Sequence, residues 1–163
     1  MCLYHPDFKI GEFPLPSYTI TTPWFDNLSR PVWSQLIPQI NPKTILEVGS
    51  YEGASACYLI DTLCEHQEIE ITCVDTWLGG IEHQPGGIAH ANMNAVERNF
   101  DNNLKAACAS AKHPVNFTKI KGPSDLTLAH LLSTGKRNYY DMVYIDGSHL
   151  APDVLCDAVL GFR

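Results

Sequence analysis

The sequence lacks any C-x-x-C pair, and its six cysteines lie far apart. Several of them fall at apolar positions of predicted helices or strands. Because zinc sites and disulfide frameworks need cysteines at characteristic spacings, we expect reduced, mostly buried thiols and no zinc site. The cysteine pattern therefore predicts a cytosolic protein.

Long hydrophobic runs and an excess of positive charge are also missing. No segment is long and apolar enough to cross a membrane, and the N-terminus lacks the basic and apolar regions of a signal peptide. The formal net charge of −7 argues against a nucleic-acid backbone or an anionic membrane surface as the main partner. We therefore expect a cytoplasmic protein with neither a nucleic-acid nor a membrane partner.

The composition that is present is typical of one soluble domain. The chain has 163 residues, of which 45% are hydrophobic and 18% charged, so it can bury a sizeable core. Residues 1–30 are rich in proline and aromatics without a sustained period, which predicts an irregular N-terminal arm before a domain at 31–163. The aromatic side chains of this arm either pack on the domain or help to cover a pocket.

Residues 43–63 change their hydrophobic period in the middle. The β-branched, apolar run 44–46 predicts a buried strand, and Glu47 interrupts it just before its end. A glycine-flanked turn follows at 49–53. After the turn, apolar residues recur at helical spacing at Ala56, Leu59, Ile60 and Leu63. A strand, glycine turn and helix in this order predict a ligand-binding turn at the carboxyl end of a strand.

Each part of this turn has an expected role. Gly49 removes a Cβ where a ligand would lie against the backbone, and Gly53 lets the helix start close to the strand. The helix N-terminus offers free N–H groups to an anion. A carboxylate at the end of a buried strand is costly unless paired, so Glu47 should meet a cation or a donor. S-adenosylmethionine carries both charges that this turn suits, although a plain turn with a capped glutamate would give the same pattern.

Further helices and strands follow from the apolar periodicity of the chain. We expect them at 29–40 (helix), 70–75 (strand), 90–111 (helix), 115–120 (strand), 126–132 (helix), 139–146 (strand) and from about 152 (helix). Ser29 and Ser124 are the expected N-caps of the helices that follow them. Strands that alternate with helices indicate an α/β fold with a doubly wound parallel sheet.

The second predicted strand ends on Asp75, where an acid can accept both hydroxyls of a ribose. The alternative is an Asx turn that caps the strand. Residues 76–89 then form a glycine-rich loop at the same edge of the sheet, which makes this loop a candidate lid. Trp77 in this loop either covers an aromatic base or packs on its own domain.

Four segments together resemble class I S-adenosylmethionine-dependent methyltransferases, and within them the catechol O-methyltransferase-like enzymes and the type 24 methyltransferase family. They are LEVGSYEGAS at 46–55, Asp75, GPSD at 122–125 and YDMVYID at 140–146. The resemblance covers about Thr44 to Leu160. It implies a Rossmann-like sheet of strand order 3-2-1-4 and methyl transfer to a hydroxyl of a small-molecule acceptor, such as a sugar, a phenol or a natural-product intermediate.

The resemblance also implies roles for matching residues. Glu47 would face the methionine ammonium of the cofactor, Ser55 its carboxylate, and Asp75 the ribose hydroxyls. Ser124 and Asp125 would reach the adenine. The full set of expected cofactor-binding residues is Glu47, Gly49, Ser50, Tyr51, Gly53, Ser55, Asp75, Thr76, Trp77, Ser124, Asp125 and Asp146.

The expected catalytic residues are His149 and Asp146. In the metal-dependent branch of the family the acid that closes the fourth strand binds magnesium, which would make Asp146 a metal ligand. His149 falls where that branch places its general base, and histidine can take a hydroxyl proton near neutral pH. Alternatively, His149 is a helix-start residue that hydrogen-bonds to Asp146.

The sequence departs from the family in having four predicted strands where class I methyltransferases have seven. The residues that would complete a magnesium site belong to the missing fifth strand. An open edge of a buried strand needs a cover, so we expect either a truncated domain or a homodimer that covers the edge of the fourth strand. A truncated or partner-completed domain without activity is therefore an alternative. A nicotinamide-dependent oxidoreductase is disfavoured, because the turn lacks G-x-G-x-x-G.

Overall fold

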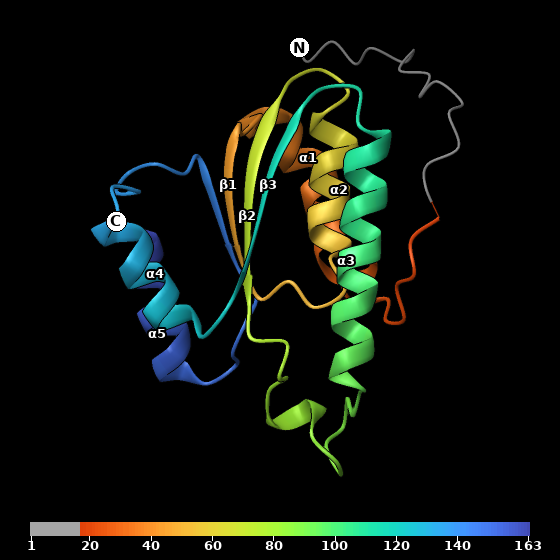
Figure 1. The fold of residues 1–163 in the computed structure, drawn as a ribbon, viewed down its shortest axis with the longest axis vertical. Helices are drawn as coiled ribbons and strands as arrows, with labels where there is room; N and C mark the ends of the chain where they lie inside the picture. Colours follow the sequence, from red (N-terminus) through yellow and green to blue (C-terminus); the bar gives the residue numbers. More distant parts are fainter. Residues whose placement is uncertain (1–16) are drawn as a thin grey trace, which may run out of the picture.

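A four-stranded parallel sheet forms the centre of the computed structural model, which describes residues 17–163 (Figure 1). The strands are β1 (Thr44–Val48), β2 (Ile69–Asp75), β3 (Val115–Lys121) and β4 (Met142–Ile145). Their order in the sheet is β3-β2-β1-β4. The predicted α/β, Rossmann-like sheet of order 3-2-1-4 is therefore confirmed.

Within the described residues, five α-helices cover both faces of the sheet, and the second, third and fourth of them connect its strands. They are α1 (Arg30–Ile40), α2 (Ala54–Leu63), α3 (Met93–Ser110), α4 (Ser124–Ser133) and α5 (Ala151–Gly161). A short π-helix, η1 (Phe25–Ser29), leads into α1, and a 3-10 turn, η2 (Ile81–His83), lies in the loop after β2. Helices α1, α2 and α3 lie on one face and α4 and α5 on the other (Figure 1).

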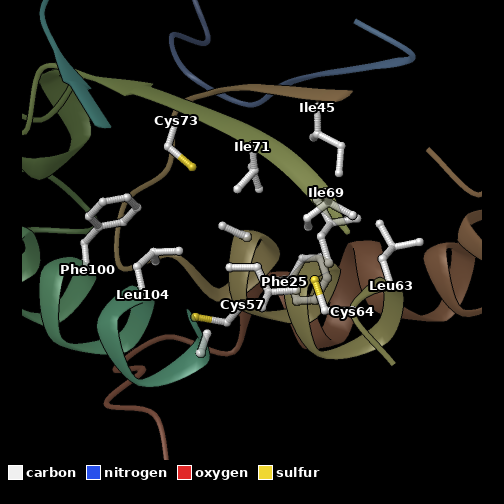
Figure 2. Packing of buried hydrophobic residues seen from close by; sticks show 14 of the residues in the cluster. Phe25, Ile45, Cys57, Leu63, Cys64, Ile69, Ile71, Cys73, Phe100 and Leu104 are labelled. Atoms are coloured by element: carbon white, nitrogen blue, oxygen red, sulfur yellow. The ribbon is translucent and has the colours of Figure 1, made fainter. Parts of the chain in front are cut away.

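Alternation along the strands divides the core between these two faces. Ile45, Ile71 and Cys73 point toward the first face, where Figure 2 shows them above Phe100 and Leu104 of α3. The opposite face carries a smaller cluster of Leu46, Val48, Val74 and Leu128. The described cysteines are free thiols, and Cys57, Cys64 and Cys73 are buried in the larger cluster.

The parallel register brings the loops of neighbouring strands to one edge of the sheet. Val48 pairs with Val74 on one side and with Ile145 on the other. The residues that follow, Gly49, Asp75 and Asp146, therefore lie together at the carboxyl edge. This edge is where open α/β sheets bind ligands.

Strand β4 is shorter than the predicted strand 139–146 because the side chain of Asp141 binds the backbone at the start of β1. Its Oδ2 accepts hydrogen bonds from the backbone N–H groups of Lys43 at 2.9 Å and Thr44 at 3.0 Å. These backbone donors lower the pKa of the Asp141 carboxyl below its ordinary value. The N–H of Asp141 also donates to the carbonyl of Thr44 at 2.8 Å, so both the backbone and the side chain of Asp141 tie the start of β4 to the start of β1.

Three predicted helix starts need correction. The long helix expected from residue 90 begins at Met93, because the Asn92 side chain accepts a hydrogen bond from the N–H of Ala95 and caps it. Ser124 is the first residue of α4 and not its cap, a position that Pro123 occupies. Ser29 does precede α1, but its side chain makes no capping hydrogen bond.

The described part of the N-terminal arm is tied to α2 and α3 by polar side chains; residues 1–16 lie outside the described residues. The buried Glu52 accepts hydrogen bonds from the N–H and the hydroxyl of Thr21. Asn103 on α3 bonds both the N–H and the carbonyl of Thr19. The Tyr18 hydroxyl donates to Asp61 at 2.8 Å. The arm is therefore docked on the domain, while the boundary at residue 30 stays a prediction.

Strand β4 pairs with β1 alone among the described strands, so one of its edges carries no partner in this part of the chain. Helices α1 and α5 each carry exposed apolar side chains, among them Val32 at 59% and Leu155 at 66% exposure. A homodimer that covers the edge stays a prediction. Within residues 17–163, no helix is both long and apolar enough to cross a membrane.

Candidate functional site

A cavity of about 710 Å³ opens at the carboxyl edge of the sheet. The loops after all four strands contribute to its wall, together with Trp24 from the arm and the first turns of α4 and α5. Its volume lies within the range of small-molecule and cofactor sites. The site predicted at this edge of the sheet therefore coincides with a cavity.

The structure brings some of the predicted site residues to this cavity and places others elsewhere. Those that line it are Gly49, Tyr51, Asp75, Thr76, Ser124, Asp125, Asp146 and His149. Those outside its lining are Glu47, Ser50, Gly53, Ser55 and Trp77.

Asp75 holds the glycine turn in place. Its Oδ2 accepts hydrogen bonds from the backbone N–H groups of Ser50 at 2.9 Å and Tyr51 at 3.0 Å. Its Oδ1 accepts from the N–H of Trp77 at 2.7 Å, which is the Asx turn expected as the alternative. Oδ2 thus accepts two hydrogen bonds, whereas Oδ1 accepts one and retains a further lone pair. Asp75 can therefore accept a ligand hydroxyl at Oδ1 in the cavity while it keeps these backbone bonds.

The two glycines of the turn also make close contacts within the protein, which the sequence did not predict. A Cβ on Gly49, at φ 86°, would lie 2.2 Å from the carbonyl oxygen of Asp146, so the backbone after β4 is a close neighbour of this glycine. A Cβ on Gly53, at φ 80°, would lie 2.4 Å from Leu104 Cδ2 and 3.0 Å from Phe100 Cδ2. Gly53 therefore allows the turn to pack against α3.

Glu47 is fully buried on the face of the sheet that α1–α3 cover, outside the cavity, so the expected contact with a cofactor ammonium is not present in this geometry. Its predicted donor is present, because the Ser55 hydroxyl donates to Glu47 Oε1. Burial raises the pKa of Glu47, and the hydrogen bond from Ser55 lowers it. Glu47 and Ser55 thus form a buried pair between β1 and α2.

Trp77 packs on its own domain and does not reach the cavity, which corrects its expected place over an aromatic base. The centroid of its ring lies 4.8 Å from that of Phe100. Lys119 Nζ lies over the Trp77 ring, 4.3 Å from the ring centroid. The indole Nε1–H donates to the carbonyl of Tyr51 at 3.0 Å. Trp77 therefore supports the glycine turn from the core of the domain, through its hydrogen bond to Tyr51.

One side of the cavity is aromatic. The ring of Trp24 lies 5.2 Å from Tyr51 and 6.1 Å from His83, and Tyr51 lies 5.4 Å from His83. The N–H of Gly80 donates to His83 Nδ1 at 3.1 Å. The arm and the loop after β2 therefore meet at this wall. Trp24 of the arm helps to cover the cavity, which is one of the two roles expected for the aromatic side chains of the arm.

The charge of the lining is of one sign. Within residues 17–163 it contains no lysine or arginine, and its carboxyl groups belong to Asp75, Glu82, Asp125, Asp146, Asp153 and Asp157. A cavity with low-dielectric walls concentrates such a field. The site therefore favours a ligand with positive charge or many hydrogen-bond donors.

The predicted catalytic pair lies at the mouth of the cavity. Asp146 is exposed and its Oδ2 accepts a hydrogen bond from the Tyr144 hydroxyl at 2.8 Å, which in turn lies 3.2 Å from Ser29 Oγ. Burial and the adjacent Asp146 raise the pKa of Tyr144, while Ser29 lowers it. His149 is exposed and follows on the same loop. The acid thus pairs with Tyr144 and not with His149.

The geometry does not fit the magnesium site that the resemblance implied. Within residues 17–163, no group of three or more His, Cys, Asp or Glu side chains is arranged to hold a metal ion. Asp146 has a tyrosine hydroxyl as its neighbour, and magnesium prefers several oxygen ligands in an octahedron. We derive no step through a metal.

Sequence reasoning missed Glu82, Asp153 and Asp157 and gave His83 no role, yet all four line the cavity. One signal was available for Asp157, since this acid interrupts the apolar run at 154–160 of a predicted helix. The loop residues carried no such signal, because a polar loop residue is ordinary without knowledge of its neighbours.

A parallel sheet of this order with a cavity over the carboxyl ends of its strands defines a Rossmann-like class of protein, in which ligands bind at that edge. Comparison with protein families matches residues 46–162 to a methyltransferase domain, that of the type 24 family. The chain belongs to this family of S-adenosylmethionine-dependent methyltransferases. A search among curated proteins finds no match.

Proposed function

We propose that this methyltransferase domain methylates a hydroxyl group of a small molecule such as a sugar, a phenol or a natural-product intermediate. The observation that carries the proposal is that the exposed His149 lines the same cavity as Gly49 and Asp75. A candidate base and the residues expected to hold the cofactor therefore share one space. This is the arrangement that transfer from a bound cofactor to an entering acceptor requires.

The residues of the cavity suit S-adenosylmethionine. Asp75 is available to a ribose hydroxyl, Ser124 and Asp125 lie at the expected adenine end, and Gly49 and Tyr51 line the cavity at the expected methionine end. The sulfonium and ammonium of this cofactor suit the acidic lining, whereas the pyrophosphate of a dinucleotide does not. When bound, the cofactor supplies an electrophilic methyl group on its sulfonium.

The same charge restricts the acceptor. A phosphorylated or carboxylated acceptor would be repelled by the carboxylates around the mouth, among them Glu82 and Asp146. A neutral hydroxyl compound enters without this penalty. The aromatic wall of Trp24, Tyr51 and His83 offers ring faces to an apolar or sugar surface.

His149 would take the proton of the acceptor hydroxyl onto its imidazole. The freed oxygen could then accept the methyl group that a bound cofactor would supply, which would leave a methyl ether and a neutral thioether as products. Asp146, held by the Tyr144 hydroxyl, orients the acceptor hydroxyl toward the cavity. General-base catalysis of this kind contributes about 10²–10⁴-fold to a rate.

The test combines calorimetry with a methyl-transfer assay on the whole chain. We expect the protein to bind S-adenosylmethionine and to methylate members of a panel of neutral sugars and phenols. His149→Ala should lower the rate by about 10²–10⁴-fold with unchanged cofactor affinity. The control is His90→Ala, an exposed histidine outside the cavity lining, which should act as the wild type. Absence of cofactor binding would refute the proposal.

A domain that binds the cofactor but catalyses nothing is the second candidate. The edge of β4 that has no partner among residues 17–163 favours it, because an open strand edge can pair with another chain. Cofactor binding without turnover on any hydroxyl compound or amine would support this candidate. Turnover that depends on His149 would exclude it.

A further inference from the structure

The aromatic wall of the cavity contains a hydrogen-bond donor that has no acceptor in the described part of the protein. His83 lines the cavity, and its side chain is 12% exposed. Its Nε2 is buried and has no hydrogen-bond partner among residues 17–163. Buried polar atoms in native proteins are nearly always paired, so an unpaired nitrogen in the wall of a ligand cavity indicates a partner that arrives with the ligand.

The contacts of the other ring nitrogen show that Nε2 carries a proton. The N–H of Gly80 donates to His83 Nδ1 at 3.1 Å, so Nδ1 is an acceptor and the proton of the neutral ring lies on Nε2. Glu82 Oε1 lies 3.3 Å from the same Nδ1 and would accept from it if the ring gained a second proton. Nε2 keeps its proton in both states. The ligand must therefore offer His83 an acceptor, such as a hydroxyl or ether oxygen.

The other polar groups of the lining make the opposite demand on a ligand. The carboxylates of Glu82 and Asp146 accept hydrogen bonds, and Oδ1 of Asp75 keeps a lone pair for another. An amine could donate to these oxygens but would leave Nε2 of His83 without a partner. A hydroxyl group both donates and accepts, so it suits both parts of the lining. Because one hydroxyl is the site of methylation, the acceptor needs at least one further oxygen.

Ring faces next to His83 add an apolar surface to this part of the cavity. The ring centroid of His83 lies 6.1 Å from that of Trp24 and 5.4 Å from that of Tyr51, and both residues line the cavity. Trp24 is 42% exposed, so part of its ring is open to a ligand. The C–H groups on one face of a sugar ring can pack on aromatic rings while its hydroxyls reach polar groups around them. A neutral sugar therefore combines the apolar face, the donors and the acceptors that this wall requires.

We propose that the methyl acceptor is a neutral sugar, and that His83 selects it by donating from Nε2 to a sugar oxygen other than the one that is methylated; this inference rests on the proposed function. The sugar ring packs against Trp24 and Tyr51, and its remaining hydroxyls donate to the carboxylates of the lining. A phenol with a single hydroxyl lacks the second oxygen. The contact with His83 therefore favours sugars over such phenols.

Two substitutions of His83 separate the donor from the other contacts of the ring. In His83→Gln the amide nitrogen can take the place of Nε2 as a donor. In His83→Asn the amide oxygen can take the place of Nδ1 and accept from the N–H of Gly80, but the shorter side chain brings no donor to the position of Nε2. The control is His113→Asn, an exposed histidine outside the cavity lining, which should act as the wild type.

Methyl-transfer kinetics of the whole chain on methyl hexopyranosides, their monodeoxy analogues and 4-ethylphenol test the contact. We expect His83→Asn to raise the KM for the best hexopyranoside by about tenfold, the scale of one lost hydrogen bond in a cavity, and His83→Gln to stay within about threefold of the wild type. Both variants should keep the wild-type kcat and the wild-type affinity for S-adenosylhomocysteine in calorimetry. For the wild type, one monodeoxy analogue should show a similar rise in KM, and His83→Asn should no longer distinguish this analogue from the parent sugar.

The outcomes separate this inference from the proposed function. Methylation of 4-ethylphenol but of no hexopyranoside, equal KM values for the two His83 variants, or a wild type that treats all deoxy analogues alike would overturn the inference while the proposed function stands. An equally large loss of affinity for S-adenosylhomocysteine in His83→Asn would assign the donor to the cofactor and overturn it too. Failure of the wild type to bind the cofactor would refute the proposed function and, with it, this inference.

Discussion

Removal of the Asp75 side chain tests how the glycine turn is held. In Asp75→Ala the backbone N–H groups of Ser50, Tyr51 and Trp77 lose the carboxylate oxygens that accept from them at 2.7–3.0 Å. Both Gly49, at φ 86°, and Tyr51, at φ 48°, have left-handed backbone conformations. The turn therefore loses the acceptors that hold its uncommon geometry, and we expect a large loss of stability.

The magnitude follows from these bonds. A hydrogen bond to a charged group contributes about 1.5–3 kcal/mol. Asp75 lies at the cavity and is only partly buried, so water replaces much of each lost bond. We expect Asp75→Ala to lower the free energy of unfolding by about 2–4 kcal/mol, and Asp75→Asn, which keeps one acceptor oxygen, by about half of that.

Urea unfolding followed by circular dichroism measures these differences. The matched control is Asp26→Ala, which removes an exposed acid paired with Arg30 at 2.7 Å and should cost less than about 1 kcal/mol. A loss below about 1 kcal/mol for Asp75→Ala would show that the turn is held by other contacts. The fold of Asp75→Asn should be less affected. A loss of cofactor affinity in this variant would therefore support the predicted contact between Asp75 and the ribose hydroxyls.

Three further changes test other parts of the structure. Burial raises the pKa of Glu47, so the stability that its protonated form contributes is complete below about pH 4 and is lost as the pH rises. The free energy of unfolding of Glu47→Gln should therefore rise relative to that of the wild type as the pH increases. Parallel pH profiles of the two proteins would contradict this. Gly53→Ala should cost about 2–4 kcal/mol because its Cβ meets Leu104, whereas Gly135→Ala, at φ 94° in open space, should cost about 1–2 kcal/mol, and equal losses would refute the packing argument. If a homodimer covers β4, light scattering should give twice the mass of one chain. Val32→Asp, at a 59% exposed position of α1, should then shift the protein toward monomer. A wild-type protein that is monomeric at all concentrations would exclude the homodimer.

Most of the fold could be predicted because local patterns and topology agree in this sequence. Apolar runs separated by helical periods define the four strands, and a parallel sheet brings their ends to one edge. Asp75 and Asp146 could be assigned to the cavity for this reason alone. The end of β4 could not, because the role of Asp141 depends on a backbone nearly a hundred residues away in the sequence.

The errors within the site have physical causes. Glu47 was expected at the ligand, yet it alternates with Leu46 and Val48 and so shares the buried face of Ile45. Trp77 follows Asp75 closely, but an Asx turn directs the chain so that the indole enters the core. His83 and Asp157 come from segments that only the folded chain brings together, and no local pattern links them.

The residues of the glycine turn face two ways. The N–H groups of Ser50 and Tyr51 are bound on the cavity side, while Glu52 is bound by Thr21 and by Asn99 on the opposite side. The turn is thus preorganised before any ligand arrives. A ligand that docks on it pays little conformational entropy to order the backbone, and more of its contact energy remains as affinity.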